Sequence, residues 1–144
     1  MKKLRVLVLI SLAIALSSGT MSIKKQYKDG TYTGESQSRY KGEPYWGQAT
    51  LEIKNDKIIK LTFQIVDKDK DKNEIFGPEY EQHFKDNPEY VQQCRNDLKG
   101  IKAYTEKFNQ SKKLEQVDAI TSATWSYNIF RDAIKVALEK AANK

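Results

Sequence analysis

Two runs of alternating apolar and polar residues flank the dipeptide Asn55-Asp56, and they constrain the fold more than any other part of the chain. The runs span residues 48–54 and 57–66. Alternation with a period of two is typical of a strand with one buried face. Asn-Asp between two such strands is a signal for a tight hairpin. The predicted buried face comprises Ala49, Leu51, Ile53, Ile59, Leu61, Phe63 and Ile65.

A further strand and an aromatic segment precede the hairpin. Asp29-Gly30 is a turn signal, and residues 31–36 have the composition of a strand. Residues 39–47 carry glycine and proline together with three aromatic side chains, and we expect them to form a loop. The aromatic residues of this loop are Tyr40, Tyr45 and Trp46.

Helical patterns follow the hairpin. A short helix is expected at residues 79–84, and Asn87 has the features of an N-cap with Pro88 at the first helical position. In the helix that follows, apolar residues recur every three or four positions, and Gly100 predicts a bend or an early end. That stripe is Val91, Cys94, Leu98, Ile101, Thr105 and Phe108.

A last helix with a wide apolar face is expected over residues 126–142. Strands followed by helices predict an α+β fold, in which an antiparallel sheet is packed against helices. We place this single domain at residues 27–144, a length that supports one core.

The first 19 residues have the features of a secretory signal peptide. Lys2, Lys3 and Arg5 precede an apolar run that ends in small residues. We therefore predict a signal peptide at residues 1–19, either cleaved or retained as an uncleaved anchor. The chain has a formal net charge of +6, and without these three residues it is +3, so the composition gives little reason to expect a nucleic-acid partner.

Three segments could suggest a metal site or a reactive thiol, but the sequence around each argues against it. The run from Asp67 to Asn73, in which Asp and Lys alternate, begins like a calcium loop. Lys72 and Pro78 occupy the positions that need glycine and glutamate, so we expect a solvated, charged loop. His83 has no second histidine or cysteine at ligand spacing for zinc. Cys94 lies on an apolar helical stripe, which favours a buried structural thiol over a reactive one.

A hydroxyl-rich turn precedes the last helix. Thr121, Ser122, Thr124 and Ser126 lie within six positions among small residues. One interpretation is ordinary capping of the helix N-terminus by a Ser or Thr side chain. The other is an anion or cofactor site, because unpaired N–H groups at a helix N-terminus suit a phosphate.

The run that contains this turn is Asp118-Ala119-Ile120-Thr121-Ser122-Ala123-Thr124. It resembles the flavinylation motif Asp-x-x-(Ser/Thr)-Gly-Ala-Thr of the FMN-binding domain family. The turn and hairpin from Asp29 onward also resemble this family. The resemblance implies that Thr124 carries FMN through a phosphoester bond, attached by a flavin transferase that uses FAD. It also implies that Asp118 is the leading acid of the motif.

The resemblance extends the cofactor-binding site to the neighbours of Thr124, which are Thr121, Ser122, Ala123, Trp125 and Ser126. Ser122 stands where the family has glycine, and serine is strained if the turn needs a positive φ. An aromatic ring would lie against the isoalloxazine. Trp125 or Tyr127 could supply it, with the other packed in the core, or it could come from Tyr40, Tyr45 or Trp46.

The resemblance implies an exported, periplasmic or cell-surface flavoprotein that passes electrons from a membrane donor to an extracytoplasmic acceptor, with membrane association. Neither an acid-base pair nor a dinucleotide fingerprint is evident in the sequence, so an electron carrier is favoured over a catalyst. Two alternatives stay open. One is a flavin-dependent reductase component, and the other is an exported binding module of the same fold that lacks the cofactor.

Overall fold

The computed structural model describes residues 25–69 and 72–143, so the predicted signal peptide or anchor lies outside the described residues. Four antiparallel strands form one sheet in the order β1-β2-β3-β4. The strands are β1 (Gly30–Gln37), β2 (Tyr45–Lys54), β3 (Lys57–Asp67) and β4 (Glu74–Ile75). The 3₁₀ helix η2 (Pro78–Phe84), α1 (Pro88–Ser111), the 3₁₀ helix η3 (Leu114–Gln116) and α2 (Thr124–Ala141) follow. The predicted α+β class is confirmed.

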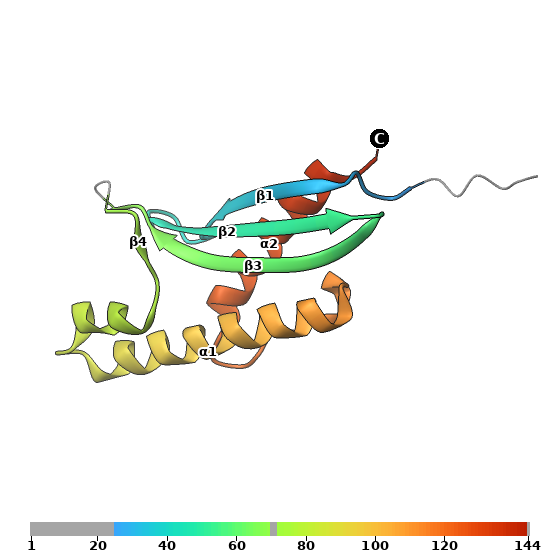
Figure 1. Ribbon diagram of the computed structural model, residues 1–144. Helices are drawn as coiled ribbons and strands as arrows, with labels where there is room; N and C mark the ends of the chain where they lie inside the picture. Colours follow the sequence, from blue (N-terminus) through green and yellow to red (C-terminus); the bar gives the residue numbers. More distant parts are fainter. Residues whose placement is uncertain (1–24, 70–71, 144) are drawn as a thin grey trace, which may run out of the picture.

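Both α-helices pack on the same face of the sheet (Figure 1). Helix α2 covers β1 and β2, while α1 lies against β3, α2 and η2. The larger apolar cluster joins β2 and β3 to the two helices through side chains such as Leu51, Leu61, Tyr104 and Phe130. A smaller cluster at the other end of the sheet contains Tyr45, Ile65, Phe76, Tyr80, Cys94 and Ile129. Each helix therefore contributes to two separate parts of the core.

The hairpin is confirmed, with one correction to its buried face. Asn55 and Asp56 have φ values of 52° and 61°, the left-handed backbone that a two-residue turn needs. Ile59, which alternation places inside, is 51% exposed, and Ile58 is buried instead. The register shifts between Glu52 and Ile53, so a β-bulge moves the first residues of β3 by one position.

The loop predicted at residues 39–47 ends earlier than expected. Tyr45, Trp46 and Gly47 already belong to β2. All three pair with β3, and Trp46 and Gly47 also pair with β1. Tyr45 points into the smaller cluster, whereas Lys68 Nζ lies 4.6 Å from the ring centroid of Trp46. Pairing with two neighbouring strands extends β2 across residues whose composition is typical of a loop.

The predicted N-cap of α1 is confirmed, because the Asn87 side chain accepts a hydrogen bond from Tyr90 N at 3.1 Å. The prediction that Gly100 bends or ends this helix is wrong, since α1 continues to Ser111 and ends at Lys112 in the left-handed region. The most buried side of α1 also differs from the predicted stripe. It comprises Cys94, Asp97, Gly100, Tyr104 and Phe108.

The prediction of a solvated loop beginning at Asp67 is wrong for Asp67 itself, which is buried at the end of β3. Its Oδ2 accepts a hydrogen bond from Tyr80 OH at 2.7 Å, and the hydroxyls of Tyr80 and Tyr45 lie 2.8 Å apart. Burial raises the pKa of Tyr45 to about 12 and also raises the pKa of Tyr80. Both tyrosines therefore stay neutral at physiological pH and can donate hydrogen bonds.

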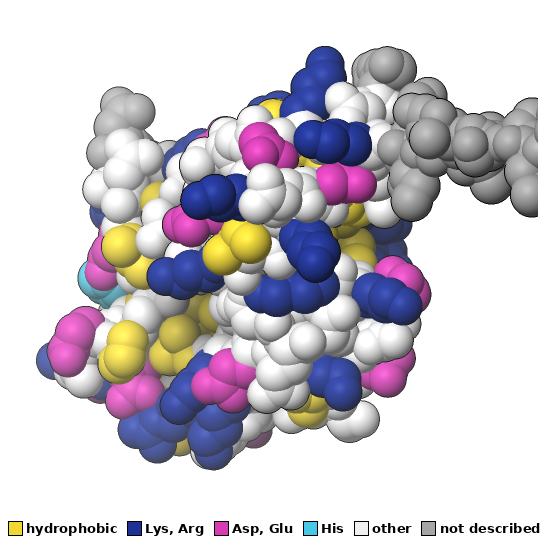
Figure 2. Space-filling model, turned by 45° about the vertical axis from the view of Figure 1, so that its right-hand side comes forward, with side chains coloured by type: hydrophobic (Ala, Val, Ile, Leu, Met, Phe, Trp, Pro, Cys, Tyr) yellow, Lys and Arg dark blue, Asp and Glu magenta, His cyan; other side chains and the backbone are white. Residues whose placement is uncertain are grey.

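The other face of the sheet is polar. Glu35 Oε1 accepts a hydrogen bond from Gln48 Nε2, and Gln48 Oε1 accepts one from Gln64 Nε2, both at 2.8 Å. On the side seen in Figure 2, lysine and arginine side chains are interspersed with aspartate and glutamate. The sheet thus has one apolar and one polar face, as expected for strands with a period of two.

Two kinds of feature are absent from the described residues. Within residues 25–69 and 72–143, no helix has the length and apolar character needed to cross a membrane. In the same ranges, no three His, Cys, Asp or Glu side chains are grouped so that they could hold a metal ion. His83 Nε2 lies 2.8 Å from Glu74 Oε1.

Candidate functional site

The hydroxyl-rich turn divides into an outer and an inner set of side chains. Thr121, Ser122 and Thr124 are exposed, whereas Ala123 and Ser126 are buried. Helix α2 begins at Thr124, two residues before its predicted start. Thr124 is therefore the first residue of the helix, and its side chain is open to the surface. Asp118 is also exposed, at the beginning of the turn.

Ser122 has a φ of 76°, a conformation that glycine adopts without steric cost and serine does not. The turn therefore has the positive φ at which a serine is strained. It lets the chain reverse direction so that Ala123 N donates to Ile120 O at 3.0 Å just before α2 begins. A serine in this place stores strain in the turn.

Replacing Ser122 with glycine should relieve that strain. We expect the Ser122→Gly variant to be as stable as the parent protein or more stable by up to about 1 kcal/mol, because the lower backbone strain outweighs the flexibility gained by the unfolded chain. Chemical denaturation would measure the change. The matched control is Ser122→Ala, which removes the hydroxyl and keeps the Cβ. A glycine variant less stable than the alanine variant would contradict the assignment of strain.

A buried carboxylate holds the inner side of the turn. Asp97 of α1 is 2% exposed, and its Oδ1 accepts hydrogen bonds from Ser126 Oγ at 2.7 Å and Ser126 N at 3.2 Å. Its Oδ2 accepts one from Gln93 Nε2 at 2.7 Å, and the same amide nitrogen donates to Ser122 O at 2.9 Å. Ser122 and Ser126 are thus both connected to α1.

Two more residues of α1 shape the turn. Tyr104 OH donates to Ala123 O and accepts from Ile120 N, both at 3.0 Å. Gly100 lies directly under Ala123, and a Cβ at Gly100 would come within 2.6 Å of the Ala123 Cβ. The glycine is needed for the close approach of the turn to α1, which explains why it interrupts neither the helix nor its packing.

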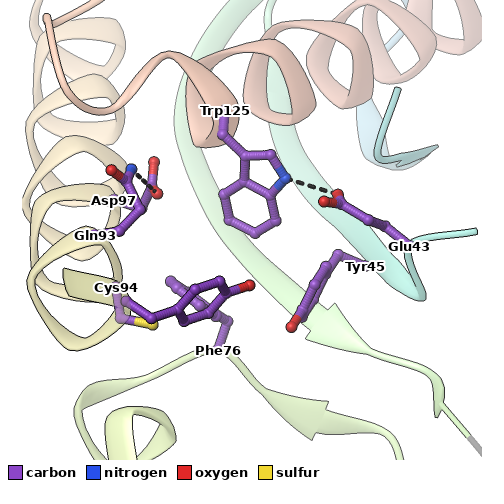
Figure 3. Close-up of a pocket in the computed structure, with 8 residues that line it drawn as sticks. Glu43, Tyr45, Phe76, Gln93, Cys94, Asp97 and Trp125 are labelled. Carbon is purple, nitrogen blue, oxygen red and sulfur yellow. Dashed lines mark hydrogen bonds between the residues drawn. The ribbon is translucent and has the colours of Figure 1, made fainter. Parts of the chain in front are cut away.

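A pocket of about 210 Å³ lies beside the turn, between α1, α2 and the start of β2. Figure 3 shows Trp125 projecting from the first turn of α2 into it, with Gln93, Cys94 and Asp97 on one side. Glu43 and Tyr45 lie on the other side. The remaining lining residues are Phe76 and Tyr90, so aromatic rings form much of the wall.

Trp125 is fixed in this pocket by contacts at both ends of its side chain. Its Nε1 donates to Glu43 Oε2 at 2.9 Å, and Ser38 Oγ donates to the same carboxylate oxygen. The indole ring packs edge-on against Tyr45, with centroids 5.2 Å apart, and lies 5.4 Å from Phe76. The indole therefore connects the first turn of α2 with the aromatic wall.

Only some of the aromatic residues that could lie against a flavin ring are found in the pocket. Trp125 and Tyr45 line the pocket. Tyr127 instead packs on Tyr104 and donates a hydrogen bond to Val117 O at 2.7 Å, so it belongs to the core. Tyr40 is 63% exposed, and Trp46 lies on the opposite, polar side of β2 from Tyr45.

Cys94 is 2% exposed, and burial raises the pKa of its thiol. The fraction of reactive thiolate at pH 8 is therefore lower than for a free cysteine. We expect the native protein to react with Ellman's reagent at least about tenfold more slowly than the protein unfolded in guanidinium. Because Cys94 is the chain's one cysteine, the absorbance change reports this thiol alone. Equal rates would contradict its burial.

The first turn of α2 offers donors to an anion. The N-cap residue Ala123 provides no side-chain hydrogen bond, and within the described residues the N–H groups of Thr124 and Trp125 have no acceptor. The exposed hydroxyl of Thr124 lies at the same helix end. The site can therefore hold a phosphate at the turn and a flat apolar ring in the adjacent pocket.

Several residues of the site were missed in the sequence. Asp97 could have been found, because it lies three positions after Cys94 and therefore on the buried side of the helix. A buried carboxylate is unusual unless it is paired. Gln93 and Glu43 carry none, since glutamine and glutamate are ordinary residues for a helix surface and a loop.

Comparison with known proteins identifies the family and the fold of the chain. Residues 42–139 match the family model of the FMN-binding domain. A solved structure, the CPE2226 protein from Clostridium perfringens, is similar with a TM-score of 0.54 and 20% identity, over 80% of this chain and 88% of that one. At this identity the similarity concerns the fold alone. No match was found among curated proteins.

Proposed function

Because the chain belongs to the FMN-binding domain family, we propose that it carries FMN covalently on the Oγ1 of Thr124. The observation that carries this proposal is the position of Thr124, exposed at the first residue of α2 and next to the pocket residue Trp125. Ordinary capping is not the role of this hydroxyl, because α2 has no side-chain cap from its N-cap residue and within the described residues Thr124 Oγ1 makes no hydrogen bond.

The residues at the turn fit a phosphodiester. The N–H groups of Thr124 and Trp125 point out of the helix end and would donate to its oxygens. A phosphodiester keeps one negative charge, which the positive end of the α2 dipole stabilises by roughly 0.3 to 1 kcal/mol. Asp118 is the acid at the start of the motif and is exposed, accessible to a modifying enzyme.

Attachment requires a hydroxyl acceptor and an activated flavin. The Oγ1 of Thr124 forms one bond to the phosphorus of the FMN half of FAD, the pyrophosphate bond breaks, and AMP leaves. The hydroxyl proton passes to a base of the flavin transferase that binds FAD. The chain itself contributes the acceptor and its surroundings, and the transferase contributes the catalysis.

We assign the flat ring system to the pocket beside Thr124. Trp125, Tyr45 and Phe76 offer aromatic surface, and burial of aromatic surface stabilises a bound ring. Hydrogen bonds from Trp125 to Glu43 and from Gln93 to Asp97 hold the wall in place before a ligand arrives. When bound, FMN supplies the electron-transfer chemistry, and the protein supplies orientation and the polarity of the site.

We place the protein in electron transfer outside the cytoplasm, between a membrane donor and an extracytoplasmic acceptor. The support is the signal-like composition of residues 1–19. A covalent bond suits such a compartment because it prevents loss of a cofactor that could not be replaced. The alternative of a reductase component predicts turnover with a soluble acceptor, whereas a carrier is only reduced by its donor and reoxidised by its acceptor.

The test is the intact mass of the purified domain after incubation with FAD and an active flavin transferase. A gain equal to FMN less one water, retained after denaturation, is expected. No gain, with the transferase active on another substrate, would contradict the attachment and favour the binding module without cofactor. Fractionation of the native host would test export separately.

A further inference from the structure

We infer that Asp97 of α1 is a positioning residue that holds Thr124 in the geometry needed for modification. The inference rests on the proposed attachment at Thr124. Asp97 is a buried carboxylate whose hydrogen bonds run to Gln93 of α1 and to Ser126 in the first turn of α2. A buried charge is costly unless it is hydrogen-bonded, and both carboxylate oxygens of Asp97 accept hydrogen bonds.

Asp97 acts as the helix cap that the sequence of the turn does not provide. A capping side chain normally belongs to the N-cap residue and accepts from the second or third N–H of the helix. In α2 the N-cap residue is Ala123, without a side-chain hydrogen bond, and Asp97 Oδ1 accepts from the third residue, Ser126, through both its N–H and its hydroxyl. The carboxylate also lies at the positive end of the α2 dipole.

This arrangement leaves the donors nearest the acceptor hydroxyl available. Because Asp97 uses the N–H of Ser126, the N–H groups of Thr124 and Trp125 remain for a phosphate. The small Ala123 at the N-cap also fits against Gly100, where a larger capping side chain would meet α1. Because the cap comes from α1, the loop before α2 is held in place while the first N–H groups of α2 stay available.

A second connection fixes the other side of Thr124. Gln93 lies one helical turn before Asp97, and its Nε2 bridges Asp97 Oδ2 and Ser122 O at 2.7 and 2.9 Å. The residues two before and two after Thr124 are therefore connected to the same carboxylate, one directly and one through Gln93. Loss of the carboxylate releases both, and a displacement of about 1 Å at a reacting atom can cost about a hundredfold in rate.

The experiment compares Asp97→Asn with the parent protein as substrates of the flavin transferase. The asparagine keeps one acceptor for Ser126 but turns an N–H₂ group toward Gln93 Nε2, also a donor, so the Gln93 connection is lost. With the full chain as substrate, we expect kcat for modification to fall about tenfold to a hundredfold, with KM changed less than about twofold. Gln93→Ala changes an exposed residue and should lower kcat less than Asp97→Asn does. It replaces Asp97→Asn as the test if that variant does not fold.

The matched control is Asn109→Ala. Asn109 also lies on α1 and connects it to β3, through hydrogen bonds with Leu61 N and O at 2.8 and 2.9 Å, but it lies about three turns from Asp97. Loss of the Asn109 side chain should lower the stability of the protein. Under conditions in which all the variants are folded, kcat for modification should not change. Modification of folded Asp97→Asn at the parental kcat, or an equal fall in Asn109→Ala, would overturn the inference.

A second measurement separates this inference from the proposed function. Amide hydrogen exchange of the unmodified proteins reports on the turn without the transferase. Asp97→Asn should raise exchange in residues 120–127 at least about tenfold more than Asn109→Ala does. If the parent protein gains no mass, the attachment at Thr124 fails, and exchange alone decides whether Asp97 holds the turn. Unchanged exchange would overturn the positioning role whatever the mass result.

Discussion

Replacement of Thr124 by alanine is expected to abolish the gain in mass on incubation with FAD and the flavin transferase. The hydroxyl oxygen of Thr124 is the one side-chain atom that can form the phosphoester at this position. The gain in mass should therefore be lost completely rather than in part. Alanine is a good helix former, and the Thr124 side chain is exposed, so the fold should be unaffected within about 0.5 kcal/mol. Intact mass spectrometry and thermal unfolding of the same samples measure both effects.

The neighbouring hydroxyls provide matched controls for this prediction. Thr121→Ala and Ser122→Ala each remove an exposed hydroxyl within three residues of Thr124. Both should still gain the mass of FMN less one water. Thr124→Ser should also be modified, at a reduced rate, because it keeps the hydroxyl but loses the methyl group that restricts its rotamers. If Thr124→Ala were still modified, or if Thr121→Ala were no longer modified, the acceptor would have to be assigned to another residue.

The sequence predicts the parts of the fold that depend on local periodicity. The hairpin and the Asn87 cap follow from patterns within a few residues, and both are present. Ile59 is the exception, since the bulge that exposes it depends on the register with β2. The prediction for Gly100 is wrong for a similar reason, because the close approach of Gly100 to Ala123 is a contact between residues far apart in the sequence.

The candidate site divides in the same way. The outer residues, Thr121, Ser122 and Thr124, lie in one short run and are readable from the motif. The residues that hold this run in place come from 29 positions earlier, and nothing in the motif specifies them. Ser126 shows the limit most clearly, since its hydroxyl has the same chemistry as its neighbours yet is buried against Asp97.

Replacement of Gly34 by alanine is expected to destabilise the protein by about 3 kcal/mol or more, because β1 and α2 approach each other too closely for a side chain. A Cβ on Gly34 would lie 2.1 Å from Ala133 O and 2.4 Å from Ala137 N. Both atoms belong to the backbone of α2, so a change of rotamer cannot relieve the clash and the helix would have to move. A fall in the melting temperature of about 10 °C or more would result.

The effect should reach the site as well as the stability. The same helix carries Thr124 and Trp125 at its start, and Ser36 Oγ of β1 donates to Ile129 O of α2 at 2.8 Å, so a shift of α2 away from β1 would also move Trp125 relative to Glu43. Gly77→Ala is the matched control, since a Cβ there would have Ile75 O as its nearest atom at 3.8 Å, and the two changes alter the unfolded chain equally. Similar melting temperatures for the two variants would show that α2 does not pack on β1 at this distance.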